Sequence, residues 1–163
     1  MKKTTIAVIA IITTLAIAVT VLLTLNWNNI QERQRQLADG ELHLTHHTVG
    51  EIFVLTATDL EALEPQVIQV VLQGGGLPGV DREFRAVPFR DIMAAFIPYQ
   101  DAVNYTVVFA AANGFAAAMP QSEAMQGAYI ALCNEDGPFR LILPGDQFAQ
   151  RWVRRLTNID IRL

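Results

Sequence analysis

Three consecutive glycines, Gly74, Gly75 and Gly76, follow a run of strand-forming residues at positions 67–72. Glycine has no side chain, so this loop can offer a ligand only backbone N–H and C=O groups. Successive N–H groups in such a loop can form an anion-binding hollow. No Gly-Lys-Ser/Thr sequence follows and no GxGxxG pattern opens a helix, which excludes the common phosphate and dinucleotide loops. A tight loop without a ligand and a backbone cradle for an anion are the two interpretations that remain.

Arginine is the second residue type here that could bind a ligand, because its planar guanidinium matches phosphate and carboxylate groups with two hydrogen bonds. The alternative is that the arginines form surface ion pairs with the 16 acidic residues of the chain. The arginines that could converge on a ligand are Arg82, Arg85, Arg90, Arg140, Arg151, Arg154 and Arg155.

The histidines His43, His46 and His47 are the only imidazoles in the chain. In a strand, His43 and His47 would share one face and could hold a metal ion with Glu41 or Glu51, whereas His46 would point to the other face. The alternative is a set of exposed strand histidines without a metal.

Nucleophilic catalysis has little support in the residues. Ser122 is the only serine and precedes Glu123 at a predicted helix start, where it is interpreted as local turn chemistry. Cys133 is the only cysteine, so the chain has no intrachain disulfide and no four-cysteine zinc site. No Ser/His/Asp arrangement is visible, and no catalytic residue is assigned.

The charge distribution argues against nucleic acid as a partner. The chain of 163 residues has a net charge of -4, and its only lysines, Lys2 and Lys3, precede an apolar segment. Beyond that segment, the chain has ten arginines and 16 acidic residues. Binding to nucleic acid depends on a basic surface, which this part of the chain lacks.

Residues 6–25 contain no charge, and threonine is their only polar residue type. A helix of this length spans about 30 Å, the thickness of the bilayer hydrocarbon, and Trp27 follows at the position of an interfacial anchor. A cleaved signal peptide is the alternative, but the run exceeds the usual apolar region of about 7 to 15 residues and no small-x-small cleavage site follows. We therefore predict a signal anchor.

Lys2 and Lys3 place residues 1–5 in the cytoplasm by the positive-inside tendency. The predicted organisation is a cytoplasmic tail (1–5), a transmembrane helix (6–25), a stalk (26–40) ended at Gly40 and one domain (41–163). The domain would then lie outside the cytoplasm, in the periplasm where the cell has one.

The sequence pattern of the domain predicts many short strands with short interspersed helices, which is typical of an α+β fold. Alternation near residues 42–44 and 52–54 indicates two strands joined by a turn, and Asn113-Gly114 is a strong hairpin signal. Further strands are predicted at 67–72, 84–87, 105–109, 115–119, 129–132, 139–143 and 159–161. Helices or helical turns are predicted at 59–63, 89–96, 121–126 and 147–155.

Several of these segments, taken in order, resemble the oxidoreductase molybdopterin-binding domain of the sulfite oxidase family. The most specific is residues 137–145 (GPFRLILPG), followed by residues 152–159 (WVRRLTNI). Residues 59–63 (DLEAL), residues 84–92 (FRAVPFRDI) and the Asn113-Gly114 hairpin also match. The resemblance covers about 41–163 and implies the sulfite-oxidase-type fold.

The family holds molybdenum through a cysteine in a segment like L-Q-C-x-G-N, and Gly74 stands at that position here. Glycine cannot replace a thiolate ligand. Arg154 matches the family's cofactor-side lysine, and Arg155 replaces its tryptophan. The resemblance therefore implies a pseudoenzyme, with no cofactor expected, although it leaves open that molybdopterin binds.

The predicted function is a membrane-anchored, extracytoplasmic module that binds an anionic small ligand or a membrane protein partner. The binding candidates are Gly74, Gly75, Gly76, Arg140 and Arg154, and no metal ligand is assigned. The alternative is a molybdopterin-dependent oxidoreductase with an atypical ligand set.

Overall fold

A computed structural model of the chain describes residues 3–72, 79–97, 104–133, 137–146 and 149–163, so Gly74, Gly75 and Gly76 lie outside the described residues. The chain forms two compact units, Met1–Glu32 and Arg33–Leu163. Each unit is described by itself.

The first unit is the greater part of helix α1 (Lys3–Asp39), which continues into the second unit. Its apolar side chains from Ile11 to Leu25 are exposed, and the hydroxyl groups of Thr20 and Thr24 donate to the carbonyls four residues earlier, at 2.9 Å each. These hydrogen bonds satisfy the polar groups within the helix itself. By length and composition α1 can cross a membrane, although a signal sequence has the same properties.

Helix α1 confirms the predicted helix over 6–25 and its continuation to residue 39. It ends where Gly40 adopts a φ of +70°, a conformation that other residues adopt at a cost. The last helical residues belong to the second unit, where Arg33 and Gln34 donate to the carbonyls of Ala111 and Ala112.

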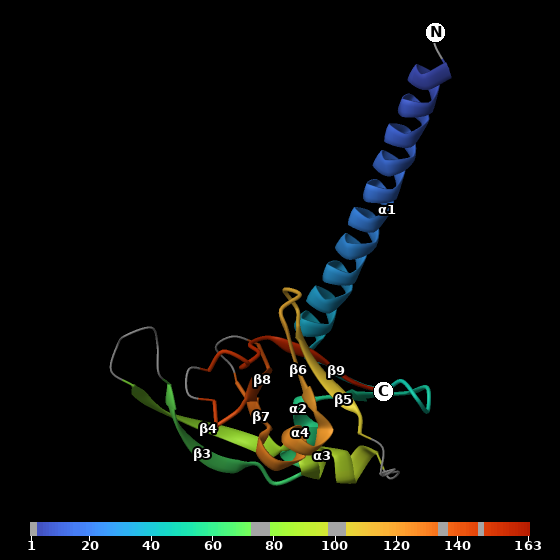
Figure 1. The fold of residues 1–163 in the computed structure, drawn as a ribbon. Helices are drawn as coiled ribbons and strands as arrows, with labels where there is room; N and C mark the ends of the chain where they lie inside the picture. The colour runs from blue at the N-terminus through green and yellow to red at the C-terminus, as the bar shows by residue number, and fades with distance from the viewer. Residues whose placement is uncertain (1–2, 73–78, 98–103, 134–136, 147–148) are drawn as a thin grey trace. The chain divides into compact units, whose positions relative to one another are not determined.

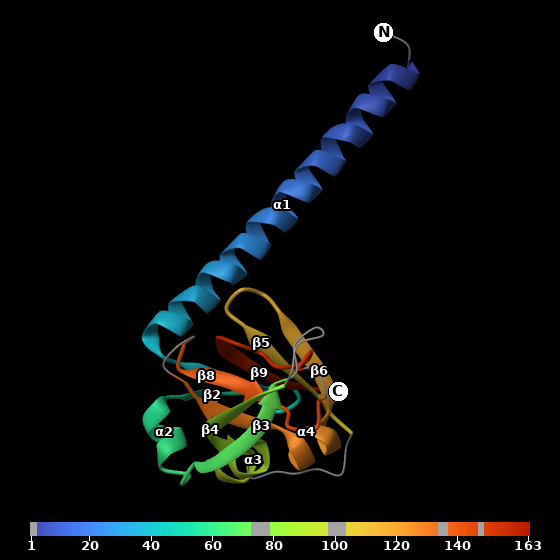
Figure 2. The same cartoon turned by 90° about the vertical axis from the view of Figure 1, so that its left-hand side faces the viewer.

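The second unit contains two β-sheets (Figures 1 and 2). The five-stranded sheet has the order β2-β1-β9-β5-β6, and the four-stranded sheet has the order β3-β4-β7-β8. The strands are β1 (Leu42–His46), β2 (Glu51–Leu55), β3 (Gln66–Leu72), β4 (Val80–Pro88), β5 (Thr106–Ala111), β6 (Ala116–Pro120), β7 (Tyr129–Leu132), β8 (Phe139–Ile142) and β9 (Leu156–Arg162).

The five-stranded sheet joins the two ends of the domain. Strand β1 pairs with β2 in antiparallel fashion and with the final strand β9 in parallel, with His43 opposite Asn158. Strands β5 and β6 form the hairpin predicted at Asn113-Gly114, where Gly114 has a φ of +88°. All other neighbouring strands of this sheet are antiparallel. The single parallel pair joins the first strand of the domain to the last.

The four-stranded sheet is antiparallel throughout, and β4 is longer than the strand predicted at 84–87. Strand β4 pairs with β7 only from Arg85 to Pro88, whereas it pairs with β3 from Val80 to Ala86. The remaining part of β3 and β4 is therefore a two-stranded ribbon that extends beyond β7 (Figure 1).

Three short helices complete the domain: α2 (Ala57–Glu61), α3 (Phe89–Phe96) and α4 (Gln121–Gly127). Thr56 and Asp59 form a capping box at the start of α2. Hydrogen bonds from the Thr56 side chain and backbone hold the pKa of Asp59 below its usual value. Helices α3 and α4 lie side by side in both views (Figures 1 and 2).

The hydrophobic core draws on both sheets and on the helices. Phe89 at the start of α3 packs edge to face on Phe109 of β5, with ring centroids 5.3 Å apart. Pro88 is the residue that precedes α3, and the helix has the predicted bounds of 89–96. Mixed helix and sheet behind an apolar N-terminal helix is the architecture that the composition and periodicity predicted.

The helix predicted over 147–155 is wrong for the described residues 149–155, which form turns, bends and irregular chain. Trp152 and Leu156 are apolar because both are buried in the domain, not because they share one face of a helix. Trp152 and Val153 lie against the four-stranded sheet, where the backbone N–H of Leu141 donates to the Val153 carbonyl at 2.9 Å. A helix over these residues would remove that hydrogen bond between two segments of the chain.

Candidate functional site

Arg140 is the buried arginine of the domain. It lies on β8, is only 9% exposed, and its guanidinium carbon lies 5.4 Å from the ring centroid of Phe84 and 5.7 Å from that of Trp152. The two rings meet edge to face with centroids 6.2 Å apart. Aromatic faces attract a cation electrostatically, and the attraction strengthens when water is excluded. These three residues form what we call the Arg140 platform.

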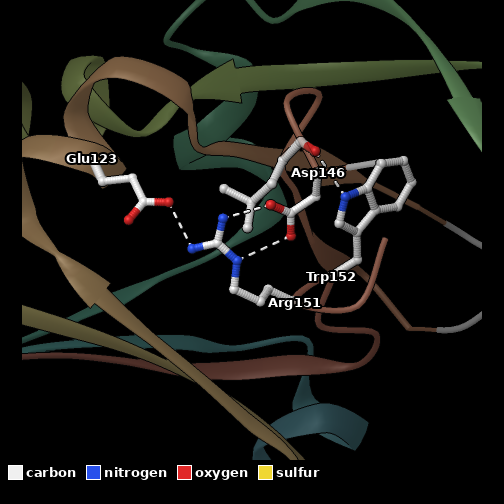
Figure 3. Close-up of polar contacts among 5 residues, drawn as sticks. Glu123, Asp146, Arg151 and Trp152 are labelled. Carbon is white, nitrogen blue, oxygen red and sulfur yellow. Dashed lines mark hydrogen bonds and ion pairs between the residues drawn. The ribbon is translucent and has the colours of Figure 1, made fainter. Parts of the chain in front are cut away.

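The chain after β8 holds Trp152 in the platform. Its indole N–H donates to the carbonyl of Leu143 at 2.9 Å (Figure 3). Its backbone N–H donates to the carbonyl of Ala149. Trp152 is buried, so the hydrogen bond satisfies the one polar atom of the indole. The position of this ring follows from non-local contacts, which is why the local spacing did not reveal it.

Arg151, the residue before Trp152, joins this segment to helix α4 (Figure 3). Its guanidinium donates to both oxygens of Asp146, at 2.5 and 3.1 Å, and to Glu123 of α4 at 2.6 Å. Hydrogen bonds to Asp146 first, and then to Glu123, raise the pKa of the Arg151 guanidinium above its usual value. We call this group the Arg151 clamp. All three of its guanidinium nitrogens donate to carboxylates, which follows the ion-pair interpretation of this arginine.

Two other arginines, Arg85 and Arg90, form ion pairs with nearby carboxylates. Arg85 forms a two-point ion pair with Glu61 of α2, at 2.6 and 3.0 Å, and Arg90 lies 3.4 Å from Asp91. These pairs follow the surface ion-pair interpretation. Arg154 is exposed, and Arg155 has a φ of +54° with its carbonyl accepting from Ala112.

The β-register relates the Arg140 platform to the strand that leads to the glycines. Arg140 lies opposite Ala131, which lies opposite Ala86, which lies opposite Gln66. Arg140 is therefore in the row of Gln66, at the far end of β3 from Leu72. At 3.3 Å per residue, the row of Gln66 lies about 20 Å along the sheet from Leu72. Whether the glycines and Arg140 share one site stays a prediction.

The β3–β4 ribbon, which leads to the glycine segment, has acidic residues on β4. A hollow of about 650 Å³ is lined by Gln69, Val70, Val71, Asp81, Arg82 and Glu83 of the β3–β4 ribbon. Among the described residues that line this hollow, two carboxylates outnumber one guanidinium, and this balance does not favour an anion.

The histidines do not form a metal site among the described residues, where no group of three His, Cys, Asp or Glu side chains could hold an ion. His43 contacts Glu41 at 3.0 Å and Gln36 at 3.3 Å, whereas His47 lies in the turn after β1. His46 corrects the expectation of exposed histidines. It is buried, with its ring 5.1 Å from that of Tyr105.

Cys133 follows β7 and is half-buried. Continuing the register of Arg85 with Leu132 places it beside Phe84, which lies opposite Ile68 of β3. From that row, Leu72 is four residues further along β3 and two strands across, or roughly 16 Å. Cys133 is thus on the same sheet face as Phe84 and Arg140, but away from the end of β3.

Neither a family model nor a curated protein matches the sequence. Among solved structures, the chain is similar to the sulfane dehydrogenase SoxCD from Paracoccus pantotrophus, with a TM-score of 0.57 and 17% sequence identity. The match covers 76% of this chain and 38% of that chain, so this chain spans well under half of its length. At this identity the likeness concerns the fold alone, and it supports a distant sulfite-oxidase-type fold.

Proposed function

We propose that the chain is a membrane-anchored binding module that uses a sulfite-oxidase-type fold without molybdenum redox chemistry. Helix α1 would be the anchor, and the domain would lie on the extracytoplasmic side. The occupant would be a small anionic ligand or a protein partner.

The observation that carries this proposal is the residue at the metal-ligand position. The resembling family places a cysteine thiolate directly after the strand that corresponds to β3, where this chain has Gly74. Molybdenum in such a site depends on a soft thiolate ligand, which backbone atoms do not replace. Cys133, the only cysteine, lies roughly 16 Å from Leu72 along the register of the sheet.

The residues that remain for binding are backbone groups of Gly74, Gly75 and Gly76 together with Arg140 and Arg154. Arg154 is exposed and can meet a ligand or partner directly. Arg140 is buried beside the rings of Phe84 and Trp152. Little water would screen its charge there, so the charge would attract a negative ligand that lay close by. This arrangement supports recognition of a negative group.

Metal analysis tests the proposal. The full chain is purified in detergent from cells supplied with molybdate, alongside a sulfite-oxidase-family enzyme that has its ligand cysteine. We expect the control to contain about one molybdenum per chain and this protein to contain less than about a tenth of that, since a thiolate is the anchoring ligand. Stoichiometric molybdenum in this protein would contradict the proposal.

A molybdopterin oxidoreductase with an atypical ligand set is the second candidate, and the position of Cys133 is its support. Cys133 lies on the sheet face of Phe84 and Arg140. If the wild type contained molybdenum and the Cys133→Ala variant lost it while remaining folded, this second candidate would be preferred.

The side of the membrane is tested separately, with protease added to spheroplasts. An extracytoplasmic domain is degraded without disrupting the membrane, whereas a domain that is degraded only after lysis would contradict this part of the proposal. The placement rests on Lys2 and Lys3, which precede the apolar segment.

A further inference from the structure

Strand β3 (Gln66–Leu72) is the end strand of the four-stranded sheet, and no strand among the described residues pairs with its outer edge. Its sequence, QVIQVVL, contains no charge and no proline. Val67 and Val71 are 64% and 52% exposed. Proteins ordinarily protect such an edge with charges, proline, a bulge or a covering segment, because unpaired N–H and C=O groups recruit another strand.

The opposite edge of the same sheet is protected. At β8, the backbone N–H of Leu141 donates to the carbonyl of Val153, so the chain after β8 covers that edge. All four residues of β8 are buried. Within one sheet, therefore, one edge is covered by the chain itself and the other is left open.

We propose that β3 pairs in antiparallel fashion with β3 of a second copy of this chain, centred on Gln69. An antiparallel pair with this centre places Val67 opposite the partner's Val71, Ile68 opposite the partner's Val70, and Gln69 opposite the partner's Gln69. In these central rows each apolar residue thus meets an apolar residue and Gln69 meets itself, whereas at the two ends of the strand Gln66 lies opposite the partner's Leu72. The two four-stranded sheets join into one sheet of eight strands.

The central row is complementary in its hydrogen bonds. The Gln69 side-chain amide donates one N–H to Glu83 of β4 at 2.8 Å. This bond leaves the second N–H and the amide oxygen of Gln69 to pair with the amide of the partner's Gln69. The row then reads Glu83, Gln69, the partner's Gln69 and the partner's Glu83, each linked to the next.

The charges of the neighbouring strands do not oppose this pairing. Val67 lies opposite Arg85, and Val71 lies opposite Asp81. The rows beside the centre therefore place Arg85 of one copy in line with the partner's Asp81, which has the opposite charge, and the central row places the two Glu83 residues in line. In each row the two charged residues are three strand spacings apart, about 14 Å, which exceeds the Debye length of about 8 Å at physiological salt. Both the attraction and the repulsion are therefore weak.

Pairing of two seven-residue strands makes a small interface, so the dimer belongs to the weak class and is best captured by cross-linking. The test uses the full chain in detergent with Cys133→Ala, so that an introduced cysteine is the only one. In the proposed register the two residues at position 69 have Cα atoms about 4.5 to 5.5 Å apart, within the range of a disulfide. Two residues at position 66 are about 20 Å apart.

Under mild oxidation, Gln69→Cys is expected to give at least about ten times more disulfide dimer than the matched control Gln66→Cys. Both residues are exposed glutamines of the same strand. Equal dimer yields for the two variants would overturn the proposal, because association through helix α1 or through random collision does not distinguish the two positions.

A second pair of variants tests the edge itself in the Gln69→Cys background. Val67→Lys places a charge against the partner's Val71 and is expected to reduce the dimer yield at least about fivefold. Ile52→Lys on β2, the end strand of the other sheet, has the same 64% exposure and is expected to leave the yield unchanged. An unchanged yield with Val67→Lys, or an equal loss with Ile52→Lys, would overturn the proposal.

Discussion

The two edges of the four-stranded sheet differ in whether another segment of the chain covers their backbone hydrogen-bonding groups. At β8, the backbone is covered by the segment that carries Trp152 and Val153, and the Arg140 platform and the Arg151 clamp hold that segment in place. At β3, valines and glutamines face solvent and the backbone edge is open. The difference indicates that side chains near β8 stabilise the fold, whereas those on the edge of β3 are available for association.

Trp152→Ala is expected to have the largest effect on folding. The indole is buried, packs against Phe84 and Arg140 and donates to Leu143. Its removal should lower the free energy of unfolding by about 3–5 kcal/mol, measured by denaturant titration. Phe115→Ala is the matched control, since this aromatic residue is exposed and should cost less than about 1 kcal/mol. Equal losses in the two variants would mean that the platform contributes nothing special to the β8 edge.

Arg151→Gln is expected to have an intermediate effect. The guanidinium is partly exposed, so solvent screens its ion pairs, and a loss of about 1 kcal/mol in unfolding free energy is reasonable. Glu123→Gln should cost less, because Asp146, whose side chain is 13% exposed, retains Arg151 in that variant. If Glu123→Gln cost as much as Arg151→Gln, the contact with α4 would be the more important half of the clamp.

Val67→Lys should have the smallest effect on folding. Its side chain is exposed and the edge of β3 is unpaired within one chain, so the unfolding free energy of the monomer should change by less than about 0.5 kcal/mol. Measured at a protein concentration too low for dimers, a larger loss would show that β3 contributes to the fold in the way that β8 does. The comparison between the two edges would then fail.

Several elements were predictable from the residues because their signals are local. The uncharged run at 6–25 required a helix, Asn113-Gly114 required a tight hairpin, and the spacing of apolar residues defined α3 and β7. The sequence also shows that β3 lacks the charges and proline that usually protect an edge strand. The sequence does not show that β3 lies at the edge of a sheet.

The tertiary structure decided what depends on residues far apart in the chain. Apolar spacing at 147–155 is compatible with a helix, but the described part forms turns and bends, and the Val153 carbonyl there accepts a hydrogen bond from Leu141 of β8. Tyr105 covers His46, which no local pattern indicates. Arg140 was a candidate for binding by its residue type alone, yet its place between two aromatic rings depends on strands β4 and β8 meeting in one sheet. Local patterns specify elements, because their hydrogen bonds and turn geometry are local; burial and pairing follow only when distant elements pack together.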